Sequence, residues 1–285
     1  MPKFELKNIC DLDVVSRQYS TANYSVIKEV VGKERNLNKN YNKALVIIDP
    51  QNDFVSSAGS LYVRKSDVMI RNLIQYIYEN IDTIDKILVT LDSHYRNSVF
   101  FPMAWMKPNG ERVEEFTVID KNSDVISTMY QKEYLEYLES VGEKLTIWPY
   151  HCIIGTPGHC IENQLNQMLV AYEIYRDREV EKVMKGMSRD CEQYGAVKSR
   201  NSYVGEWAKR LLKYDTIEIC GEARDFCVYE TVKQLCECYS EMVKEGLPKR
   251  INVLYNLTDV IGDEKECEKK YSELVDKYGI KIVNI

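Results

Sequence analysis

The hydrophobic positions of this chain alternate between short runs rich in β-branched residues and longer segments in which apolar residues recur every three or four positions. The short runs predict strands, and they lie at residues 44–48, 86–91, 145–147, 180–184, 216–219, 251–254 and 280–283. The longer segments between them have helical spacing. Because strands that alternate with helices form βαβ units, the pattern predicts a three-layer α/β/α fold with a mostly parallel central sheet.

Three of the helices can be predicted in more detail. The first begins at Ser66, which we expect to act as its N-cap, and its apolar residues recur at helical steps. The second covers 228–242, and the third covers 265–278 and ends at Gly279, which suits a C-cap. We expect each helix to pack its apolar stripe against the sheet.

The composition narrows the class of protein and of partner. The 285 residues include 38 Lys and Arg against 44 Asp and Glu, and the two signs are interleaved, so no basic surface for nucleic acid is predicted. No apolar run approaches the roughly 18 residues that a membrane helix needs, and the start lacks the pattern of a secretory signal. Nine cysteines without paired spacing indicate free thiols in a reducing, cytoplasmic compartment. The oligomeric state stays open, a homo-oligomer included.

The chain is predicted to contain one domain and an N-terminal extension. Residues 1–42 combine weak helical periodicity with polar positions and precede the first strong strand signal. Residues 43–285 carry the whole alternating pattern. The full chain has 13 Gly and 7 Pro, which are too few for a long linker. We therefore predict an extension over 1–42 and a single α/β domain over 43–285.

Several polar residues directly follow predicted strands, where ligands bind in parallel sheets. Asp49 ends the run ALVII, and it is either a loop residue that accepts backbone N–H groups or a general base. Partial burial would raise its pKa and suit it to accept a proton from a thiol. Lys185 ends another run and is either solvated or points into the same cleft, where its charge would lower the pKa of a cysteine.

One carboxylate and two imidazoles also follow predicted strands. Asp92 and His94 are two positions apart, so in an extended chain their side chains point to the same side, and His151 follows the run 145–147. This donor set suits zinc, iron or manganese with positions left for water. Each histidine taken alone is equally explained as a hydrogen-bonded loop residue. His159 lacks such partners, and we predict a structural role for it.

Cys227 differs from the other cysteines in its context. It lies where a predicted strand ends at Cys220 and a helix begins, with Gly221 between them to allow a bend. The N–H groups at a helix N-terminus stabilise a thiolate and can also hold an oxyanion. We therefore predict that Cys227 is a nucleophile. Six thiols that lack this context are predicted to be inert, namely Cys152, Cys160, Cys191, Cys236, Cys238 and Cys267.

Five segments in order, DPQNDF, LDSH, WPYHC, VMKG and GEARDFCV, resemble the nicotinamidase branch of the isochorismatase-like cysteine hydrolases over about residues 43–285. The resemblance implies a role for each matching residue: a catalytic triad of Asp49, Lys185 and Cys227; metal ligands Asp92, His94 and His151; an oxyanion hole formed by the N–H groups of Ala223 and Cys227, next to a cis peptide between Glu222 and Ala223; and the aromatic residues Phe54 and Trp148 against the pyridine ring.

The resemblance implies a metal-dependent amidohydrolase that converts nicotinamide to nicotinate and ammonia through a cysteine thioester, as in NAD salvage. The implied cofactor is one divalent ion, zinc before iron or manganese. Two departures from the family are the long stretch 101–118 and Glu222, where an apolar residue is usual. The alternatives are another amide, ureido or carbamoyl hydrolase of the same superfamily, and a catalytically silent binding module.

Overall fold

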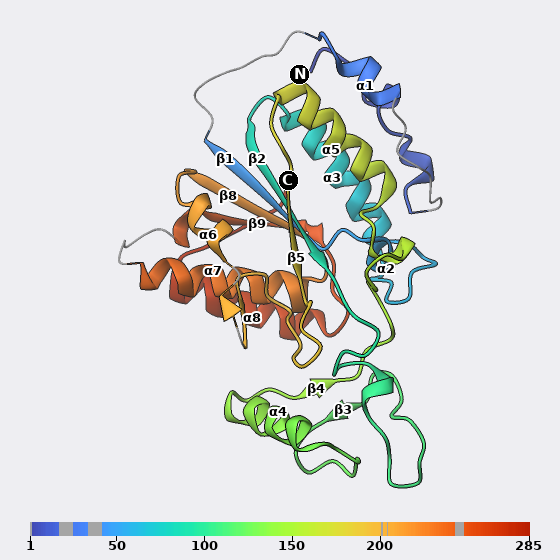
Figure 1. The fold of residues 1–285 in the computed structure, drawn as a ribbon. Coiled ribbons are helices and arrows are strands. Elements are labelled where there is room, and N and C mark those ends of the chain that lie inside the picture. The colour runs from blue at the N-terminus through green and yellow to red at the C-terminus, as the bar shows by residue number, and fades with distance from the viewer. Residues whose placement is uncertain (1, 17–24, 34–41, 201, 204, 243–247) are drawn as a thin grey trace.

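The structure is a computed structural model that describes residues 2–16, 25–33, 42–200, 202–203, 205–242 and 248–285. Its centre is a six-stranded sheet with the order β10-β9-β8-β1-β2-β5, in which each neighbouring pair is parallel (Figure 1). The strands are β1 (Lys43–Ile48), β2 (Ile84–Asp92), β5 (Glu181–Lys185), β8 (Thr216–Gly221), β9 (Ile251–Thr258) and β10 (Lys281–Val283). The predicted α/β fold with a parallel sheet is confirmed.

Helices cover both faces of this sheet (Figure 1). One layer contains α3 (Ser66–Asn80) and α5 (Asn163–Arg176), and the other contains α6 (Glu206–Leu211), α7 (Tyr229–Glu241) and α8 (Glu264–Tyr278). The central strand β1 serves both layers because its successive side chains point to opposite faces: Leu45 and Ile47 belong to one hydrophobic core, and Val46 and Ile48 to the other. The α8 helix ends as predicted, with Gly279 at a φ of 71°.

The predicted N-cap of α3 is wrong by one position. Lys65 is the N-cap, with a left-handed φ of 75°, and Ser66 is the first helical residue. The Ser66 hydroxyl donates to the carbonyl oxygens of Val63 at 2.7 Å and Phe54 at 3.1 Å instead of capping an N–H group. The residue type was informative about the boundary, but the buried carbonyls nearby decided what the hydroxyl binds.

The strand predicted at 145–147 does not enter the central sheet. Instead β4 (Leu145–Thr146) pairs antiparallel with β3 (Val118–Ile119). Together with α4 (Met129–Ser140) these strands form a lobe over residues 102–147, which we call the β3–β4 lobe, that extends beyond the carboxyl edge of the sheet (Figure 1). The long stretch noted in the sequence lies in this lobe.

The described residues before β1 pack on the layer formed by α3 and α5. The ring of Phe4 makes edge contacts with Tyr78 and Tyr175 at centroid distances of 5.8 and 5.3 Å, and α1 (Ser25–Val30) contacts α5. Part of the predicted extension, 17–24 and 34–41, lies outside the described residues.

Three further short elements belong to the fold. The α2 helix (Asn52–Val55) follows β1, and β6 (Lys198–Ser199) pairs with β7 (Ser202–Tyr203).

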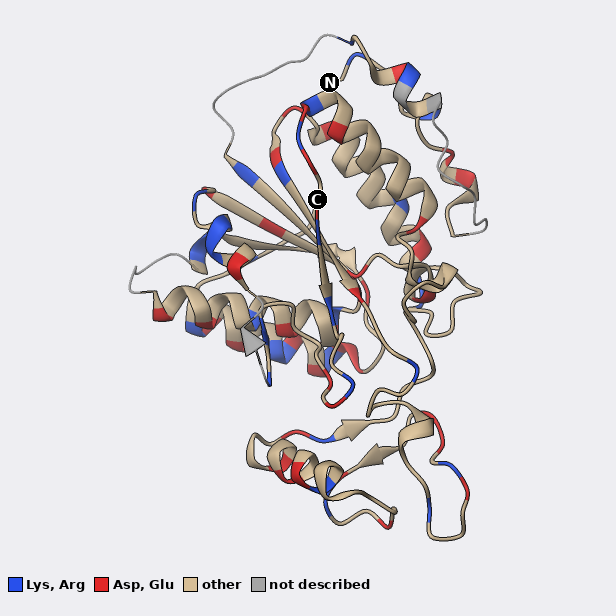
Figure 2. Ribbon diagram, viewed as in Figure 1, with Lys and Arg blue, Asp and Glu red and all other residues tan. Residues whose placement is uncertain are grey.

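Figure 2 shows both signs of charge distributed over helices and loops, while most of the central sheet is uncharged. None of the helices in the described ranges has the length and apolar character that crossing a bilayer requires.

Candidate active site

The three predicted catalytic side chains meet at the carboxyl edge of the sheet. The Nζ of Lys185 lies 2.9 Å from Oδ2 of Asp49 and 3.4 Å from Sγ of Cys227. All three are buried, with exposed fractions of 2%, 0% and 7% for Lys185, Asp49 and Cys227. The strands β1 and β5 and the segment after β8 therefore bring an ammonium, a carboxylate and a thiol into contact.

Asp49 is held by a residue that the sequence analysis did not single out. The hydroxyl of Thr90 on β2 donates to Oδ1 of Asp49 at 2.6 Å, and its oxygen accepts the Asp49 N–H at 3.0 Å. These two bonds fix both the backbone and the carboxylate of Asp49, whose φ is 45°. Only the pairing of β1 with β2 places Thr90 there, so no local sequence signal could have found it.

Lys185 joins the catalytic group to the predicted metal ligands. Its Nζ also lies 2.9 Å from Oδ1 of Asp92, and it donates to the carbonyl of Gln193 at 3.3 Å. One buried cation is therefore shared by two buried carboxylates. Buried charges are stable only when they are paired in this way, so Lys185 keeps Asp49 and Asp92 close together without leaving either carboxylate unpaired.

Burial dominates the protonation of the thiol. It raises the pKa of Cys227 well above the ordinary value, and the charge of Lys185 lowers it by less. The expectation that Lys185 and the helix end give Cys227 a low pKa is therefore wrong for this buried thiol. Burial also raises the pKa of Asp49. For Lys185, burial is outweighed by Asp49, Asp92 and the thiol, and its pKa lies well above the usual value. The thiol must then lose its proton to a base during the reaction.

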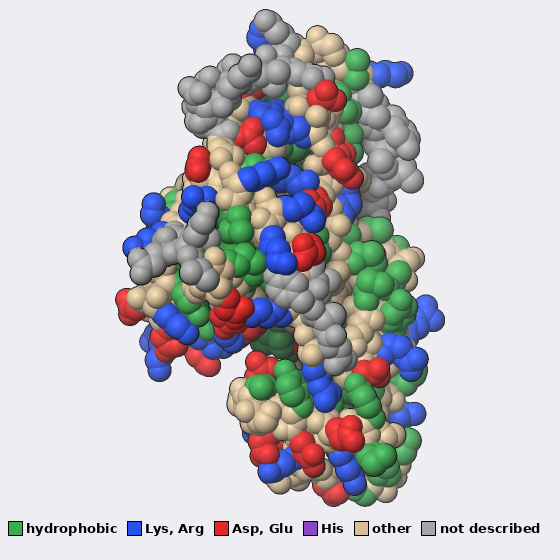
Figure 3. All heavy atoms as spheres, turned by 60° about the vertical axis from the view of Figure 1, so that its left-hand side comes forward, with side chains coloured by type: hydrophobic (Ala, Val, Ile, Leu, Met, Phe, Trp, Pro, Cys, Tyr) green, Lys and Arg blue, Asp and Glu red, His purple; other side chains and the backbone are tan. Residues whose placement is uncertain are grey.

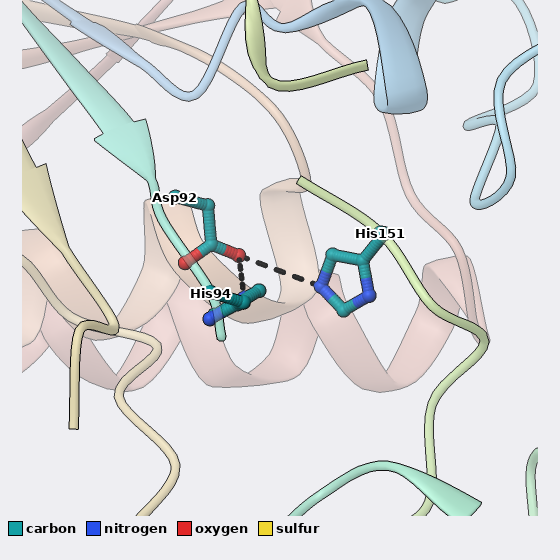
Figure 4. A group of neighbouring side chains, drawn as sticks. All are labelled: Asp92, His94 and His151. Atoms are coloured by element: carbon teal, nitrogen blue, oxygen red, sulfur yellow. Dashed lines mark ion pairs between the residues drawn. The ribbon is translucent and has the colours of Figure 1, made fainter. Parts of the chain in front are cut away.

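Asp92, His94 and His151 form a second buried group next to the first (Figure 4). Oδ2 of Asp92 lies 2.9 Å from Nε2 of His94 and 3.5 Å from Nε2 of His151. One donor atom from each of the three residues lies within 4.8 Å of the others. Asp92 and His94 follow β2 as predicted, but His151 lies in the loop that returns from the β3–β4 lobe and not at a strand end of the sheet.

The hydrogen bonds of both imidazoles favour a cation between them. Nδ1 of His94 lies 3.0 Å from the carbonyl of Gly186, and Nδ1 of His151 lies 2.7 Å from the carbonyl of Pro149. A carbonyl needs a donor, so Nδ1 carries the proton and Nε2 presents a lone pair in each ring. The buried Nε2 of His94 makes no hydrogen bond of suitable geometry among the described residues, although Oδ2 of Asp92 lies only 2.9 Å away. Two lone pairs and a carboxylate oxygen that converge in this way fit a divalent metal ion.

Gly186 leaves the room that this group needs. Its φ is 74°, and a Cβ there would lie 2.6 Å from Cε1 of His94 and 2.8 Å from Oδ1 of Asp92. A residue with a side chain at this position would have to displace His94 or Asp92. Gln51 supports the same strand end, because its amide accepts the Asp92 N–H and donates to the Asp92 carbonyl, each at 2.7 Å. The segment DPQNDF contains Gln51, but only the neighbouring strand shows what it binds.

A small cavity opens beside Cys227 and the histidine group. Phe54 and Trp148, the predicted ring-binding residues, both line it. Two further aromatic residues, Tyr194 and Phe226, line it as well and were not predicted. Nε1 of Trp148 donates to the Tyr194 hydroxyl at 3.0 Å, and the Trp148 and Phe226 rings meet edge to face at 5.2 Å. These aromatic walls suit a flat ring. The full lining is Phe54, Leu61, Asp92, Trp148, His151, Glu192, Tyr194, Ala223, Phe226, Cys227 and Ile261.

The segment after β8 carries Ala223 and Cys227 to the cavity. The peptide bond between Glu222 and Ala223 is cis, as the resemblance implied. Residues 224–228 then form a wide turn of π-helical geometry that leads into α7, and Cys227 lies in that turn, two residues before the regular helix. Ala223 is 4% exposed. Both residues predicted for an oxyanion hole are therefore on the cavity wall.

His159 and Asp53 have structural contacts. Nε2 of His159 lies 2.8 Å from the hydroxyl of Ser93, outside the catalytic cavity. Oδ2 of Asp53, on α2, accepts the N–H of Cys152 at 2.7 Å, across 99 positions of sequence. It thereby ties the loop after β1 to the loop that carries His151.

Solved structures share this fold. The structure of the yeast nicotinamidase superposes with a TM-score of 0.63 and 22% identity, covering 85% of this chain and 100% of that one. The same enzyme bound to the inhibitor nicotinaldehyde gives 0.63 and 21% with the same coverage. Pyrazinamidase of Pyrococcus horikoshii in complex with zinc gives 0.53 and 21%, covering 86% and 99%. The chain therefore has the α/β fold of the isochorismatase-like hydrolases.

Two relatives that are similar in sequence are both nicotinamidases. The nicotinamidase of Saccharomyces cerevisiae is 26% identical over 245 residues, which are 85% of this chain and 99% of that protein. The nicotinamidase of Schizosaccharomyces pombe is 26% identical over 212 residues, 71% of this chain and 80% of that protein. No protein-family model matches the chain. These findings confirm the resemblance to the nicotinamidase branch of that hydrolase class.

Proposed function

We propose that this protein is a metal-dependent nicotinamidase, which hydrolyses nicotinamide to nicotinate and ammonia. The observation that carries the proposal is the contact of the Cys227 thiol with Lys185, and of Lys185 with Asp49, beside a buried Asp-His-His group. The two yeast relatives of similar length are nicotinamidases. The aromatic cavity next to the thiol suits the pyridine ring of the substrate, with Phe54 and Trp148 in contact with it.

In the first half of the reaction Asp49 accepts the proton of the Cys227 thiol. The sulfur attacks the carboxamide carbon, and the carbonyl electron pair moves to the oxygen, which the N–H groups of Ala223 and Cys227 stabilise. Asp49 then donates its proton to the leaving nitrogen, the C–N bond breaks, and ammonia departs. The raised pKa of Asp49 suits both proton transfers. Lys185 keeps its charge and holds Asp49 in place.

In the second half a water molecule attacks the thioester carbon. Asp49 accepts one proton of this water, and the same two N–H groups stabilise the oxyanion. The C–S bond then breaks and releases nicotinic acid, which loses its remaining proton to solvent as nicotinate. The sulfur recovers its proton from Asp49, so the enzyme returns to its starting state. Asp49 carries every one of these protons, so the enzyme needs no second general acid or base.

The residues Asp92, His94 and His151 would hold the metal ion, and we propose zinc, the ion bound to the Pyrococcus horikoshii pyrazinamidase. A bound divalent ion supplies a positive centre that orients and polarises the pyridine ring. His151 and Asp92 line the cavity directly, so a ring stacked on Phe54 and Trp148 would face this group with one edge and Cys227 with its carboxamide.

The domain boundaries and compartment are part of the proposal. The catalytic unit is 43–285, which contains every residue of the site, and 1–42 is an extension whose described residues pack on it. No disulfide joins any of the nine cysteines, all of which lie in the described part of the chain, and this supports a reducing, cytoplasmic compartment. A small-molecule amide is the partner we propose, with neither nucleic acid nor a membrane.

The deciding experiment measures ammonia release from nicotinamide by the purified protein, together with its metal content. We expect turnover, about one divalent ion per chain, and a loss of turnover after chelation that zinc restores. Turnover without any bound metal would favour the alternative of another amide or carbamoyl hydrolase. Absence of turnover with nicotinamide and with carbamoyl compounds, in zinc-loaded protein, would favour a silent binding module.

A further inference from the structure

Glu222 is a buried acid that the proposed mechanism does not use. It directly precedes Ala223, and its exposed fraction is 0%. Its Oε2 accepts the N–H of Asp259 at 3.1 Å, while its Oε1 has no hydrogen-bond partner among the described residues. A buried polar atom without a partner lowers stability. A residue that is kept at such a cost beside a reactive group is a candidate for a functional role.

The bonds of Glu222 join three separate parts of the site. Its backbone N–H donates to the carbonyl of Ile48, the residue before Asp49, at 2.9 Å, and its side chain holds Asp259. The N–H of Arg224 donates to the carbonyl of Asp259 at 2.7 Å. The N–H of Asp259 therefore binds Glu222, the residue before Ala223, and the carbonyl of Asp259 binds Arg224, the residue after Ala223.

Asp259 begins a loop, residues 259–262, that contributes Ile261 to the wall of the cavity. Asp225 holds the other end of this loop, because its carboxylate accepts the N–H groups of Ile261 at 3.1 Å and Gly262 at 2.7 Å. The loop and the Ala223 segment thus support each other. Of the side-chain bonds that connect them, the one from Glu222 lies nearest in sequence to the N–H group of Ala223.

We propose that Glu222 is a positioning residue that holds the Ala223 N–H in place for the oxyanion by binding the 259–262 loop. The inference rests on the proposed function, because it assigns the Ala223 N–H to the oxyanion hole. Its consequence is specific: losing the Glu222 bond weakens the stabilisation of a tetrahedral oxyanion more than the binding of a flat ligand.

The test compares two substitutions of Glu222 in the full chain. Glu222→Gln keeps a side-chain oxygen that can accept the Asp259 N–H, whereas Glu222→Leu is of similar size and has no acceptor. We expect kcat for nicotinamide to fall about tenfold in Glu222→Leu, with KM changed less than about threefold, and both constants to stay within about threefold in Glu222→Gln. Glu222→Met serves as a second apolar variant if the leucine variant does not fold.

Two inhibitors distinguish stabilisation of the oxyanion from binding of the pyridine ring. With nicotinaldehyde the Cys227 thiol adds across the C=O bond: a C–S bond forms, the carbonyl pair moves to oxygen, and the thiol proton passes to Asp49. Nicotinate forms no such adduct. We expect Glu222→Leu to weaken nicotinaldehyde about as much as it lowers kcat and to leave nicotinate inhibition unchanged. Equal weakening of both ligands, or of neither, would overturn the proposal.

Glu218, on the strand β8 that directly precedes Glu222, provides a matched control. It is also a buried acid, but its carboxylate binds Tyr76 at 2.5 Å and Lys43 at 3.1 Å, away from the cavity. Glu218→Leu should lower the melting temperature without changing the ratio of nicotinaldehyde to nicotinate inhibition. A similar change of this ratio in Glu218→Leu would show that the effect is only structural and would count against the role of Glu222.

A measurement independent of activity distinguishes failure of this inference from failure of the proposed function. Amide hydrogen exchange in a peptide covering 255–262 should speed up in Glu222→Leu and not in Glu222→Gln. If the wild-type protein does not hydrolyse nicotinamide, the proposed function fails, and exchange still decides whether Glu222 holds the loop. Unchanged exchange in Glu222→Leu overturns the inference even if the wild-type protein is active.

Discussion

The site at the carboxyl edge of the sheet and the β3–β4 lobe next to it are built in different ways. In the site, side-chain bonds join residues that are 41, 42 and 93 positions apart, as between Thr90 and Asp49, Lys185 and Cys227, and Lys185 and Asp92. In the lobe many side-chain bonds are local: Thr128 and Gln131 form a capping box at α4, and Asp120 binds Ser123. The site therefore depends on the whole fold, and much of the lobe depends on short stretches of sequence.

The site and the β3–β4 lobe also differ in how far their side chains are buried. The charged groups of the site are enclosed, whereas large apolar side chains of the lobe such as Met129, 78% exposed, and Phe116, 57% exposed, reach solvent. Figure 3 shows hydrophobic side chains among charged ones on the surface of this part of the molecule. Substitutions should therefore have large and coupled effects in the site and small, local effects in the lobe. Four substitutions and one pH series, ordered by expected effect, test this difference.

The largest effect is expected at Cys227. Cys227→Ala removes the nucleophile, and the rate of ammonia release should fall by at least about 10³-fold while the fold is kept. Steady-state kinetics measures the rate, and circular dichroism checks the fold. The control is Cys236→Ala, which removes a buried thiol from α7 and should leave kcat unchanged. Full turnover by Cys227→Ala would end the covalent mechanism.

Lys185→Met should remove activity and stability together. It leaves the buried carboxylates of Asp49 and Asp92 without the cation that lies 2.9 Å from each. Losing one partner of a buried ion pair costs about 3–5 kcal/mol, which urea denaturation can measure. A variant with wild-type stability would show that the two carboxylates do not depend on this charge.

The pH dependence of Lys185→Met has a definite sign. Burial already raises the pKa of Asp49 above its usual value, and the lysine charge opposes this rise. Without the lysine the folded-state pKa rises further, so the protonated form contributes stability at low pH, and this contribution is lost as pH rises through the folded-state value. The stability difference from the wild type should therefore be larger at pH 8 than at pH 5. A difference that shrinks as pH rises would contradict this account.

Gly186→Ala should reduce metal binding. The added Cβ would clash with His94 at 2.6 Å and with Asp92 at 2.8 Å, so the affinity for zinc, measured by competition with a chelating dye, should fall by about 10–100-fold. The matched control is Gly142→Ala in the lobe. Gly142 has a similar φ of 77° but no atom within 4 Å of the added Cβ, so this variant should bear only the backbone strain. Equal zinc loss in both variants would argue against a role for the clash.

The smallest effect is expected in the lobe. Thr128→Ala removes the capping box of α4 and should cost about 1 kcal/mol of local stability. Hydrogen exchange in α4 should become faster, while kcat for nicotinamide should change less than about twofold. A large loss of kcat would show that the lobe and the site are coupled, and would remove the distinction between them.

Much of the fold could be predicted because the signals are local. The runs that became β1, β2 and β8 are short, apolar and β-branched, and helices with clear apolar stripes lie between them. The run at 145–147 has the same local character, yet it pairs with β3 in the lobe. Local pattern indicates that a segment is extended, but the choice of its neighbour depends on which strand the rest of the chain presents.

The site could be predicted in part for a related reason. Asp49, Asp92, His94, Lys185 and Cys227 were identifiable because each lies at the end of a predicted element or in a segment that resembles a known family. Thr90 and Tyr194 carry no such mark, and Glu222 was noted only as a departure from the family. Their contacts with Asp49, Trp148 and Asp259 exist only once distant segments meet.

The sequence by itself determined the residue types available for chemistry and the strand ends that most of them follow, because strand periodicity and backbone preferences act over a few neighbouring residues. Tertiary structure alone decided that Lys185 is shared between two carboxylates and that His151 arrives from the lobe. It also decided that burial keeps Cys227 a thiol. Pairing and desolvation depend on which distant groups come together in space, and this is a property of the packed chain as a whole.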